Sequence, residues 1–153
     1  MGFKSWFFGK PISKLIIEDD FFGTIKGELV KKGQVDWSVI RQVGDKKMWV
    51  HFGGSDNSIN ESHRSMIIEA LQQEQNILEQ VKVQLTRFCG ERDLDKTKLD
   101  ENFTYNMIYC DRGYFVVSLI WKETLYFLSF LFKDNEFTKL EVINPKNMQE
   151  ISF

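Results

Sequence analysis

The spacing of apolar residues changes at Gly53-Gly54 and changes back near Tyr105. Within residues 35–52, apolar side chains tend to fall at every second position, which is the period of a strand with one buried face. Within residues 66–88 they recur every three or four positions, which is typical of an amphipathic helix. The order strand, helix, strand predicts an α+β fold, with a mostly antiparallel sheet packed on one long amphipathic helix.

Gly, Asp and Asn residues of the kind found in turns separate eight short strand patterns. The strands are predicted near residues 15–18, 23–30, 35–43 and 47–52, and near 104–110, 114–121, 125–132 and 137–143. The first four are expected to form an antiparallel meander. The predicted organisation is a single domain with a lead-in (1–14), strands (15–52), a helix (58–90), strands (104–143) and a tail (146–153).

The helix is predicted to run from 58 to 90. Ser58 and Glu61 have the spacing of a capping box, and Gly90 suits the left-handed residue that ends many helices. If it is continuous from 59 to 89, about 31 residues at 1.5 Å each would measure roughly 46 Å. A compact chain of this size is only roughly 40 Å across. The helix is therefore expected either to cross the whole molecule or to bend in the polar stretch 72–76.

The segment 114–132 is nearly all apolar, apart from the charged pair Lys122-Glu123 at its centre. Charges at that position are costly in a bilayer, so the segment predicts a hairpin and no membrane span. Its two strands are apolar on both faces, which requires cover on both sides. The helix is expected to cover one face, and the first meander or a partner chain the other. A homodimer through this hairpin is one alternative.

Charge and cysteine content narrow the function classes. The 153 residues carry a net charge of −2, and neither half is strongly basic, so nucleic acid is not an expected partner. Cys89 and Cys110 lack metal-ligand spacing and are too few for a disulfide framework. They predict a reduced protein, located in the cytoplasm. The first residues contain no apolar stretch long enough for a secretory signal.

Two polar residues, His63 and Glu74, fall inside the apolar stripe of the predicted helix. They are three turns, or roughly 16 Å, apart, so they cannot act on one proton. The simpler interpretation is a histidine near the open helix end and a glutamate whose head reaches water. The alternative is a pair of separated polar groups in a groove. The rest of the stripe is formed by Ile67, Leu71, Leu78, Val81 and Leu85.

No recognised catalytic motif accompanies this pattern. His51 has no metal-site spacing to His63 or to either cysteine, and Gly53-Gly54-Ser55 lacks the Gly-Lys-Ser/Thr ending of a phosphate-binding loop. A GxSxG nucleophile motif is also missing. We therefore predict no catalytic residue, no metal and no cofactor. A pocket near His51 or His63, between helix and sheet, is kept as an alternative that would make the protein a small-ligand binder or an enzyme.

A protein partner is the expected ligand. Carboxylates at the rim of a docking surface speed association with a basic partner, and exposed tryptophans are frequent binding hot spots. Trp6 and Trp49 are candidate anchors, whereas Trp37 is expected in the core. The predicted partner-binding residues are Glu18, Asp19, Asp20, Asp36, Asp56 and Trp49.

The acidic run 16–23, a strand with Trp37, the stretch Trp49-Val50-His51-Phe52 and the long helix resemble certain small bacterial domains of unknown function. The pattern is also similar to immunity proteins of bacterial toxin systems, over residues 15–88. This resemblance implies a compact α+β domain and transfers no catalytic residue. The expected function is non-enzymatic binding that neutralises a cognate toxin by occlusion. A self-associating structural subunit is a further alternative.

Overall fold

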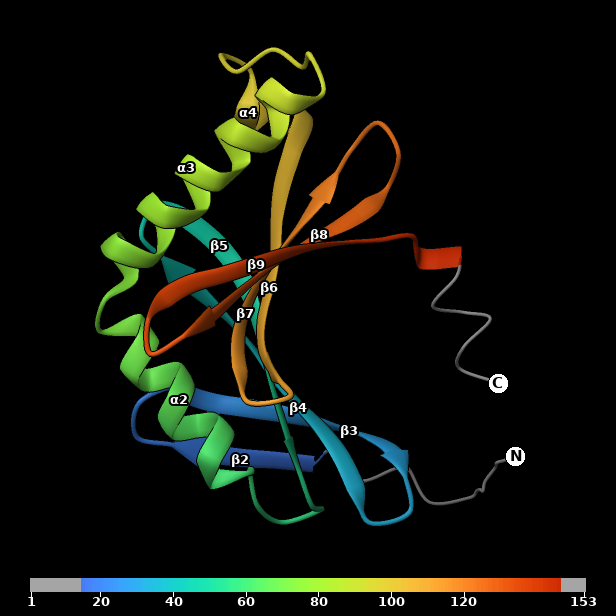
Figure 1. Ribbon diagram of the computed structural model, residues 1–153. Coiled ribbons are helices and arrows are strands. Elements are labelled where there is room, and N and C mark those ends of the chain that lie inside the picture. Colours follow the sequence, from blue (N-terminus) through green and yellow to red (C-terminus); the bar gives the residue numbers. More distant parts are fainter. Residues whose placement is uncertain (1–14, 147–153) are drawn as a thin grey trace.

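The computed structural model describes residues 15–146, in which eight strands form one sheet in the order β2-β3-β4-β5-β6-β7-β8-β9 (Figure 1). The expected lead-in 1–14, with Trp6, lies outside the described residues, as do residues 147–153 of the expected tail. The strands are β2 (Leu15–Asp19), β3 (Gly23–Lys31), β4 (Gln34–Val43), β5 (Lys46–Gly54), β6 (Phe103–Asp111), β7 (Tyr114–Trp121), β8 (Tyr126–Lys133) and β9 (Glu136–Ile143).

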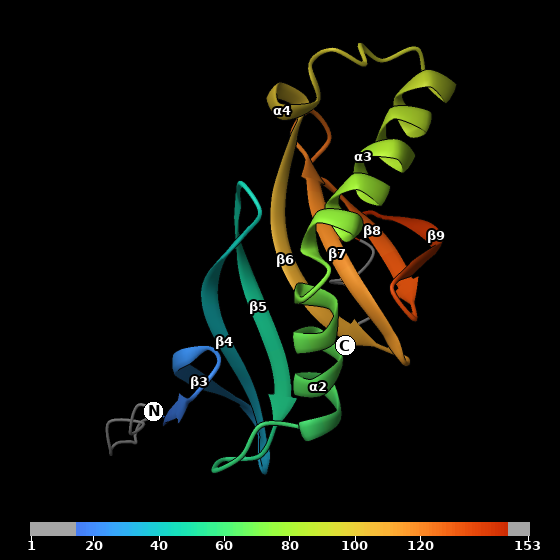
Figure 2. The same ribbon diagram turned by 90° about the vertical axis from the view of Figure 1, so that its left-hand side faces the viewer.

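Three helices connect the two halves of the sheet: α2 (Glu61–Leu71), α3 (Glu74–Glu91) and α4 (Leu99–Asn102). Figure 2 shows α2 and α3 in front of β6 and β7, so both pack on the same face of the sheet. Helix α2 contacts β5, β6 and β7, whereas α3 contacts β9. The α+β class and the mostly antiparallel sheet predicted from the sequence are confirmed. Helix α4 falls in a segment that the apolar pattern leaves unassigned.

Two antiparallel meanders, β2–β5 and β6–β9, meet at one parallel contact. Strands β5 and β6 pair only at Trp49 with Met107 and at Val50 with Ile108. The chain must cross over through the helices to re-enter the sheet in the same direction, as parallel neighbours require. Because each strand continues beyond these two pairs, the sheet has unpaired β5 and β6 backbone on both sides of the contact.

The prediction of one long helix is wrong, because the chain leaves the helical conformation at Gln73 (φ −122°, ψ 35°). Helix α2 ends at Leu71 and α3 begins at Glu74. The break falls in the polar stretch 72–76 where a bend was expected, since those residues offer no apolar side chain to pack across the junction. The Glu74 carboxylate accepts a hydrogen bond from the Gly44 backbone N–H, in the β4–β5 turn. This bond fixes the start of α3 against the sheet.

Both predicted helix ends also differ from the structure. The N-cap is Asn60, whose side chain accepts the His63 backbone N–H, whereas the Ser58 hydroxyl bonds Ser55 in the preceding turn. At the other end the helix continues through Gly90 to Glu91, and the left-handed residue is Asp93 (φ 56°). Asn and Ser are nearly equal as N-caps, so the pattern alone could not choose between them.

The helix-facing side of the sheet carries the main core. The alternation predicted for the first strands holds, with Trp37, Val50 and Phe52 at most 1% exposed on the helix side. Their partners are the apolar stripe of α2 and α3 and the inner residues of β7 and β8. The core cluster includes Ile67, Leu71, Ile77, Val81, Leu85, Phe88, Phe115, Val117, Leu119, Leu128, Phe130 and Phe132.

The hairpin β7–β8 is central and buried on both faces. Val116 and Leu131 point away from the helices, yet each is only 1% exposed. Strands β6 and β9 pair along its two edges. The first meander does not stack on this hairpin as a second layer, because it extends the same sheet through β5. A homodimer through residues 114–132 stays a hypothesis, with Leu125 (64% exposed) at the hairpin tip.

The packing of the β4–β5 turn on α3 predicts unequal effects for two glycine substitutions. Gly44 (φ +59°) and Gly33 (φ +79°) both have left-handed backbone, but a Cβ on Gly44 would lie 2.6 Å from Leu78 Cδ1 and one on Gly33 would meet nothing within 4 Å. Gly33→Ala should cost about 1 kcal/mol of unfolding free energy, for conformation alone. Gly44→Ala should cost about 2 kcal/mol, since Leu78 must also move. Urea denaturation of both variants checks this, and equal losses would contradict the contact.

Candidate functional site

A cavity of about 420 Å³ opens where β5 and β6 diverge after their short parallel contact. We call it the histidine cavity. Its wall combines the start of β4, the end of β5, the start of α2, and strands β6 to β9. Several polar groups converge there between apolar side chains, as in many ligand sites. The polar lining is Asp36, His51, His63, Tyr109, Cys110, Ser118 and Ser129, and the apolar lining includes Phe52, Met107, Phe127 and Ile143.

Two neighbouring strands place an Asp–His pair at the cavity. His51 on β5 lies directly opposite Ser38 on β4, so Asp36 is its diagonal neighbour on the same face. The His51 Nδ1 atom lies 3.0 Å from Asp36 Oδ2 and 3.1 Å from Oδ1. A carboxylate only accepts, so Nδ1 carries the proton, which in the neutral ring leaves Nε2 as an acceptor. The two side chains are 26% and 38% exposed, so the pair lies at the cavity mouth.

The second histidine, His63, bonds β5 backbone at a position where β5 has no β6 partner. Past Val50 the β5 backbone has no β6 partner, and the Gly53 N–H donates to His63 Nδ1 at 3.2 Å. The Gly53 carbonyl in turn accepts the Asn60 N–H at 2.7 Å, just before α2. Because Nδ1 accepts a hydrogen bond, the proton of the neutral His63 ring is on Nε2. Within the described residues His63 therefore has a structural bond on Nδ1, whereas its Nε2–H donor makes none.

The glycine pair Gly53-Gly54 is explained by close packing at this turn. A Cβ on Gly54 would lie 2.3 Å from the Ser58 carbonyl oxygen, and one on Gly53 would lie 3.3 Å from the His63 ring. The two glycines therefore let α2 approach the end of β5, as expected for turn geometry and not for phosphate binding.

Hydroxyl groups line the inner part of the cavity. Ser118 and Ser129 face each other across β7 and β8 and are 3% and 2% exposed. Within the described residues the Ser129 Oγ makes no hydrogen bond, and it lies beside the Tyr109 phenol without the geometry of one. Burial raises the pKa of that phenol above its usual value, with a smaller opposing effect from Ser129. The phenol is therefore a neutral hydrogen-bond donor at neutral pH.

Cys110 also borders the histidine cavity, but as a packed thiol. Its Sγ lies 3.8 Å from the His63 carbonyl oxygen and 3.6 Å from Met66 Sδ. Burial raises the pKa of Cys110 to about 11 and also raises that of Cys89, which is 0% exposed. Because the thiolate is the nucleophile, such environments suppress cysteine chemistry.

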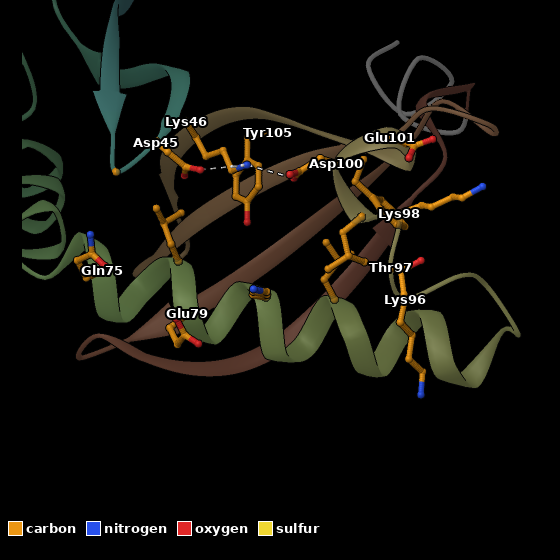
Figure 3. Close-up of a pocket in the computed structure, with 16 residues that line it drawn as sticks. Asp45, Lys46, Gln75, Glu79, Lys96, Thr97, Lys98, Asp100, Glu101 and Tyr105 are labelled. Atoms are coloured by element: carbon orange, nitrogen blue, oxygen red, sulfur yellow. Dashed lines mark hydrogen bonds and ion pairs between the residues drawn. The ribbon is translucent and has the colours of Figure 1, made fainter.

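A larger cavity of about 700 Å³ lies on the other side of the β5–β6 contact, between the β4–β5 turn, α3 and the segment before β6. Figure 3 shows the Lys46 ammonium between Asp45 and Asp100, next to the Tyr105 ring. These N–O distances are 3.7 and 3.1 Å. Burial, with the nearby Asp100 and Asp45, raises the pKa of Tyr105 to about 12. The charged groups nearest the ring are thus paired with one another, whereas Lys96 and Lys98 extend away from the cavity (Figure 3).

The face of the first meander turned away from the helices carries exposed apolar residues. Ile16, Ile40 and Trp49 are 48%, 49% and 44% exposed, and Ile40 lies directly opposite Trp49. A groove of about 500 Å³ crosses this face and is bordered by Asp36 and His51, which also line the histidine cavity. We call this surface, formed by the outward side chains of β2 to β5, the open face.

The residues predicted to bind a partner do not form one patch. Glu18, Asp36 and Trp49 lie on the open face, where Glu18 accepts from the Thr24 hydroxyl and Asp36 bonds His51. Asp56 is exposed in the loop before α2. Asp19 and Asp20 both bind Arg64 of α2, at 2.7 and 2.9 Å.

Asp19 has a structural role. It accepts the backbone N–H groups of Phe21 and Phe22 and two hydrogen bonds from the Arg64 guanidinium. Although burial alone would raise the pKa of Asp19, these hydrogen bonds outweigh it and lower the pKa below its usual value. Glu74, in contrast to the expected solvated head, bonds the Gly44 N–H.

Comparisons with protein-family models, with curated proteins and with solved structures found no match to this chain. Among residues 15–146, no three His, Cys, Asp or Glu side chains are arranged to hold a metal ion. In the same part of the chain, no helix combines the length and apolar character needed to cross a bilayer. The site must therefore be interpreted from its own geometry.

Sequence reasoning did not include Tyr109, Ser118 and Ser129 in a site. Ser118 and Ser129 stand in otherwise apolar strands at matched distances from the hairpin turn, and this was the available signal. It could not indicate that the first meander would bring Asp36 and His51 to the same place, because that depends on the β5–β6 contact.

Asp19 and Asp20 both bind Arg64, so their substitutions form a matched pair whose effects on the free energy of unfolding can be compared. Asp19→Asn should lower the free energy of unfolding by about 2–3 kcal/mol at pH 7, because a carboxylate 9% exposed loses its bonds to Arg64. Asp20→Asn should change it by less than about 0.5 kcal/mol, since Asp20 is 94% exposed. Chemical denaturation of both variants tests this.

The pH dependence follows from the lowered pKa of Asp19. Its contribution is fully present above the unfolded pKa of about 3.9 and is lost as the pH falls through the lower folded value. The stability difference between wild type and Asp19→Asn should therefore shrink below about pH 4. A difference that stays constant down to pH 2 would contradict this role.

The thiols should be slow to react in the folded protein. A pKa of about 11 at Cys110 leaves roughly 300-fold less thiolate at pH 7 than an ordinary thiol with a pKa of about 8.5. Labelling with a disulfide reagent should be at least about a hundredfold slower in buffer than in denaturant. Rapid labelling of Cys110 in the native state would show that this thiol is activated.

Proposed function

We propose that this protein is a non-enzymatic protein-binding domain of the immunity type, which neutralises a bacterial toxin by covering its active surface. The observation that supports this proposal is the set of exposed apolar side chains on the open face, namely Ile16, Ile40 and Trp49. The helices pack on the opposite face of the sheet, and no element of residues 15–146 packs over this one (Figure 1).

Trp49 is the natural centre of the interface. Its ring stands beside His51 on the same strand, with 6.3 Å between ring centroids, and opposite Ile40 on β4. Large aromatic anchors surrounded by smaller apolar contacts dominate the free energy of many protein complexes. Regular antiparallel strands carry these side chains, so little conformational freedom would be lost on binding.

The charges of the open face favour a basic partner. Glu18, Glu28 and Asp36 contribute three carboxylates, against two ammonium groups from Lys26 and Lys47, at outward positions of β2 to β5. The exposed residues Asp20 and Asp56 lie in the turns at opposite ends of this meander. Negative charges at a rim raise the association rate with a basic surface and are screened by salt.

Strands β2 to β5 have 5, 9, 10 and 9 residues, so together they cover at most an area of roughly 20 by 30 Å. This area is smaller than the roughly 800 Å² per partner of a standard interface. The turns that carry Asp20 and Asp56 therefore belong to the proposed contact. We place this role in the cytoplasm, on the basis of the two free cysteines.

Binding to the product of the adjacent gene tests the proposal. That product should be toxic when expressed alone and should form a complex with this protein. Trp49→Ser should raise the dissociation constant at least about thirtyfold, the effect of losing a hot-spot aromatic. Calorimetry measures the constant, and survival on co-expression measures neutralisation.

Val83→Ser is the matched control, since Val83 is a 53% exposed apolar residue on α3, on the helix side of the molecule. It should leave both affinity and neutralisation unchanged. A neighbouring product that neither binds nor harms cells would refute the proposal, as would a complex that tolerates Trp49→Ser but not Val83→Ser.

A further inference from the structure

The histidine cavity holds a buried polar group that has no partner among the described residues. The Ser129 Oγ is inaccessible, its residue is 2% exposed, and it makes no hydrogen bond within the described residues. Leaving a buried hydroxyl unsatisfied costs about 1–3 kcal/mol. Ser129 lines a cavity of about 420 Å³. Because its Oγ has almost no accessible surface, a small molecule there supplies the missing bond once the hydroxyl turns about the Cα–Cβ bond toward the cavity.

The histidines give the cavity a defined hydrogen-bond pattern. His51 donates from Nδ1 to Asp36 and keeps Nε2 as an acceptor, whereas His63 accepts at Nδ1 and keeps Nε2–H as a donor. Tyr109 adds a neutral phenol, and the Ser129 hydroxyl can donate or accept. A ligand that matches this set needs both a donor and an acceptor, as an amide or lactam group has.

The remaining lining excludes charged ligands. Among residues 15–146 no Lys or Arg borders the cavity, so an anion would be desolvated without compensation from that part of the chain. Its carboxylate, Asp36, is already bonded to His51. Phe52, Met107 and Phe127 provide apolar and aromatic walls that suit a flat ring.

We infer that the histidine cavity binds an uncharged heteroaromatic molecule carrying an amide or lactam group, held by the imidazoles of His51 and His63 and by the Ser129 hydroxyl. This inference does not rest on toxin binding, because the cavity exists in the isolated chain. Asp36 and His51 also border the groove of the open face, so an occupied cavity would lie next to the proposed interface.

Titration followed by amide NMR tests the inference with four probes. Nicotinamide and hypoxanthine carry the required group, benzoate carries a charge, and indole lacks the acceptor. At least one of the first two should bind with a dissociation constant below about 1 mM, and should shift the Gly53 amide resonance, whose proton bonds His63. Benzoate and indole should bind at least about tenfold more weakly.

The variant Ser129→Ala separates a binding role from a structural one. Removing a hydroxyl that makes no hydrogen bond within the described residues should leave the melting temperature unchanged or raise it. It should also raise the dissociation constant of the bound probe roughly tenfold. Ser38→Ala, on the open face opposite His51 and outside the cavity lining, should change neither quantity. The inference is overturned if neither nicotinamide nor hypoxanthine binds, or if benzoate or indole binds equally well. It is also overturned if Ser129→Ala lowers the melting temperature or leaves probe binding unchanged.

Discussion

The two residue pairs that join β5 to β6 are the constraint on which the rest of the structure depends. Trp49 with Met107 and Val50 with Ile108 turn two antiparallel meanders into one sheet. A parallel contact this short leaves backbone groups of both strands without strand partners, and buried groups of that kind must find other partners. At Gly53 the partners are the His63 ring and the Asn60 N–H. The same divergence of the strands opens a cavity on each side of the contact.

This arrangement explains why polar residues gather at the centre of the sheet. Asp36 and His51 belong to the first meander, Ser118 and Ser129 to the second, and His63 to the helix that bridges them. Their convergence requires all three elements to be in place, so the histidine cavity is a property of the assembled fold. The cavity borders the open face through Asp36 and His51, which connects the proposed ligand to the proposed docking surface.

Local patterns in the sequence were sufficient to predict the strands. Alternating side chains such as Met48, Val50 and Phe52, and turn residues such as Gly33 and Gly44, place the eight strands within about two residues. The break at Gln72-Gln73 was visible as a polar gap in the stripe. The cap at Asn60 was not, since Ser58 satisfies the same local rule.

Long-range contacts set the limit of prediction for the site. Periodicity shows that His63 lies in the apolar stripe, but not that its ring faces the Gly53 N–H. The sequence places a carboxylate at Asp19, but it does not show that Arg64, 45 residues later, binds that carboxylate. In both cases the partner is fixed by how α2 packs on the sheet. Such packing depends on the whole core and not on any short segment.

The most direct test of this account is the protonation state of the His63 ring, measured by ¹⁵N NMR at neutral pH. If His63 of α2 accepts the Gly53 N–H of β5, its Nδ1 is unprotonated and its Nε2 carries the proton. Nδ1 then also shows a coupling across the hydrogen bond to the Gly53 amide. A ring protonated on Nδ1, or a Gly53 amide that exchanges with solvent as fast as an exposed loop, would contradict it.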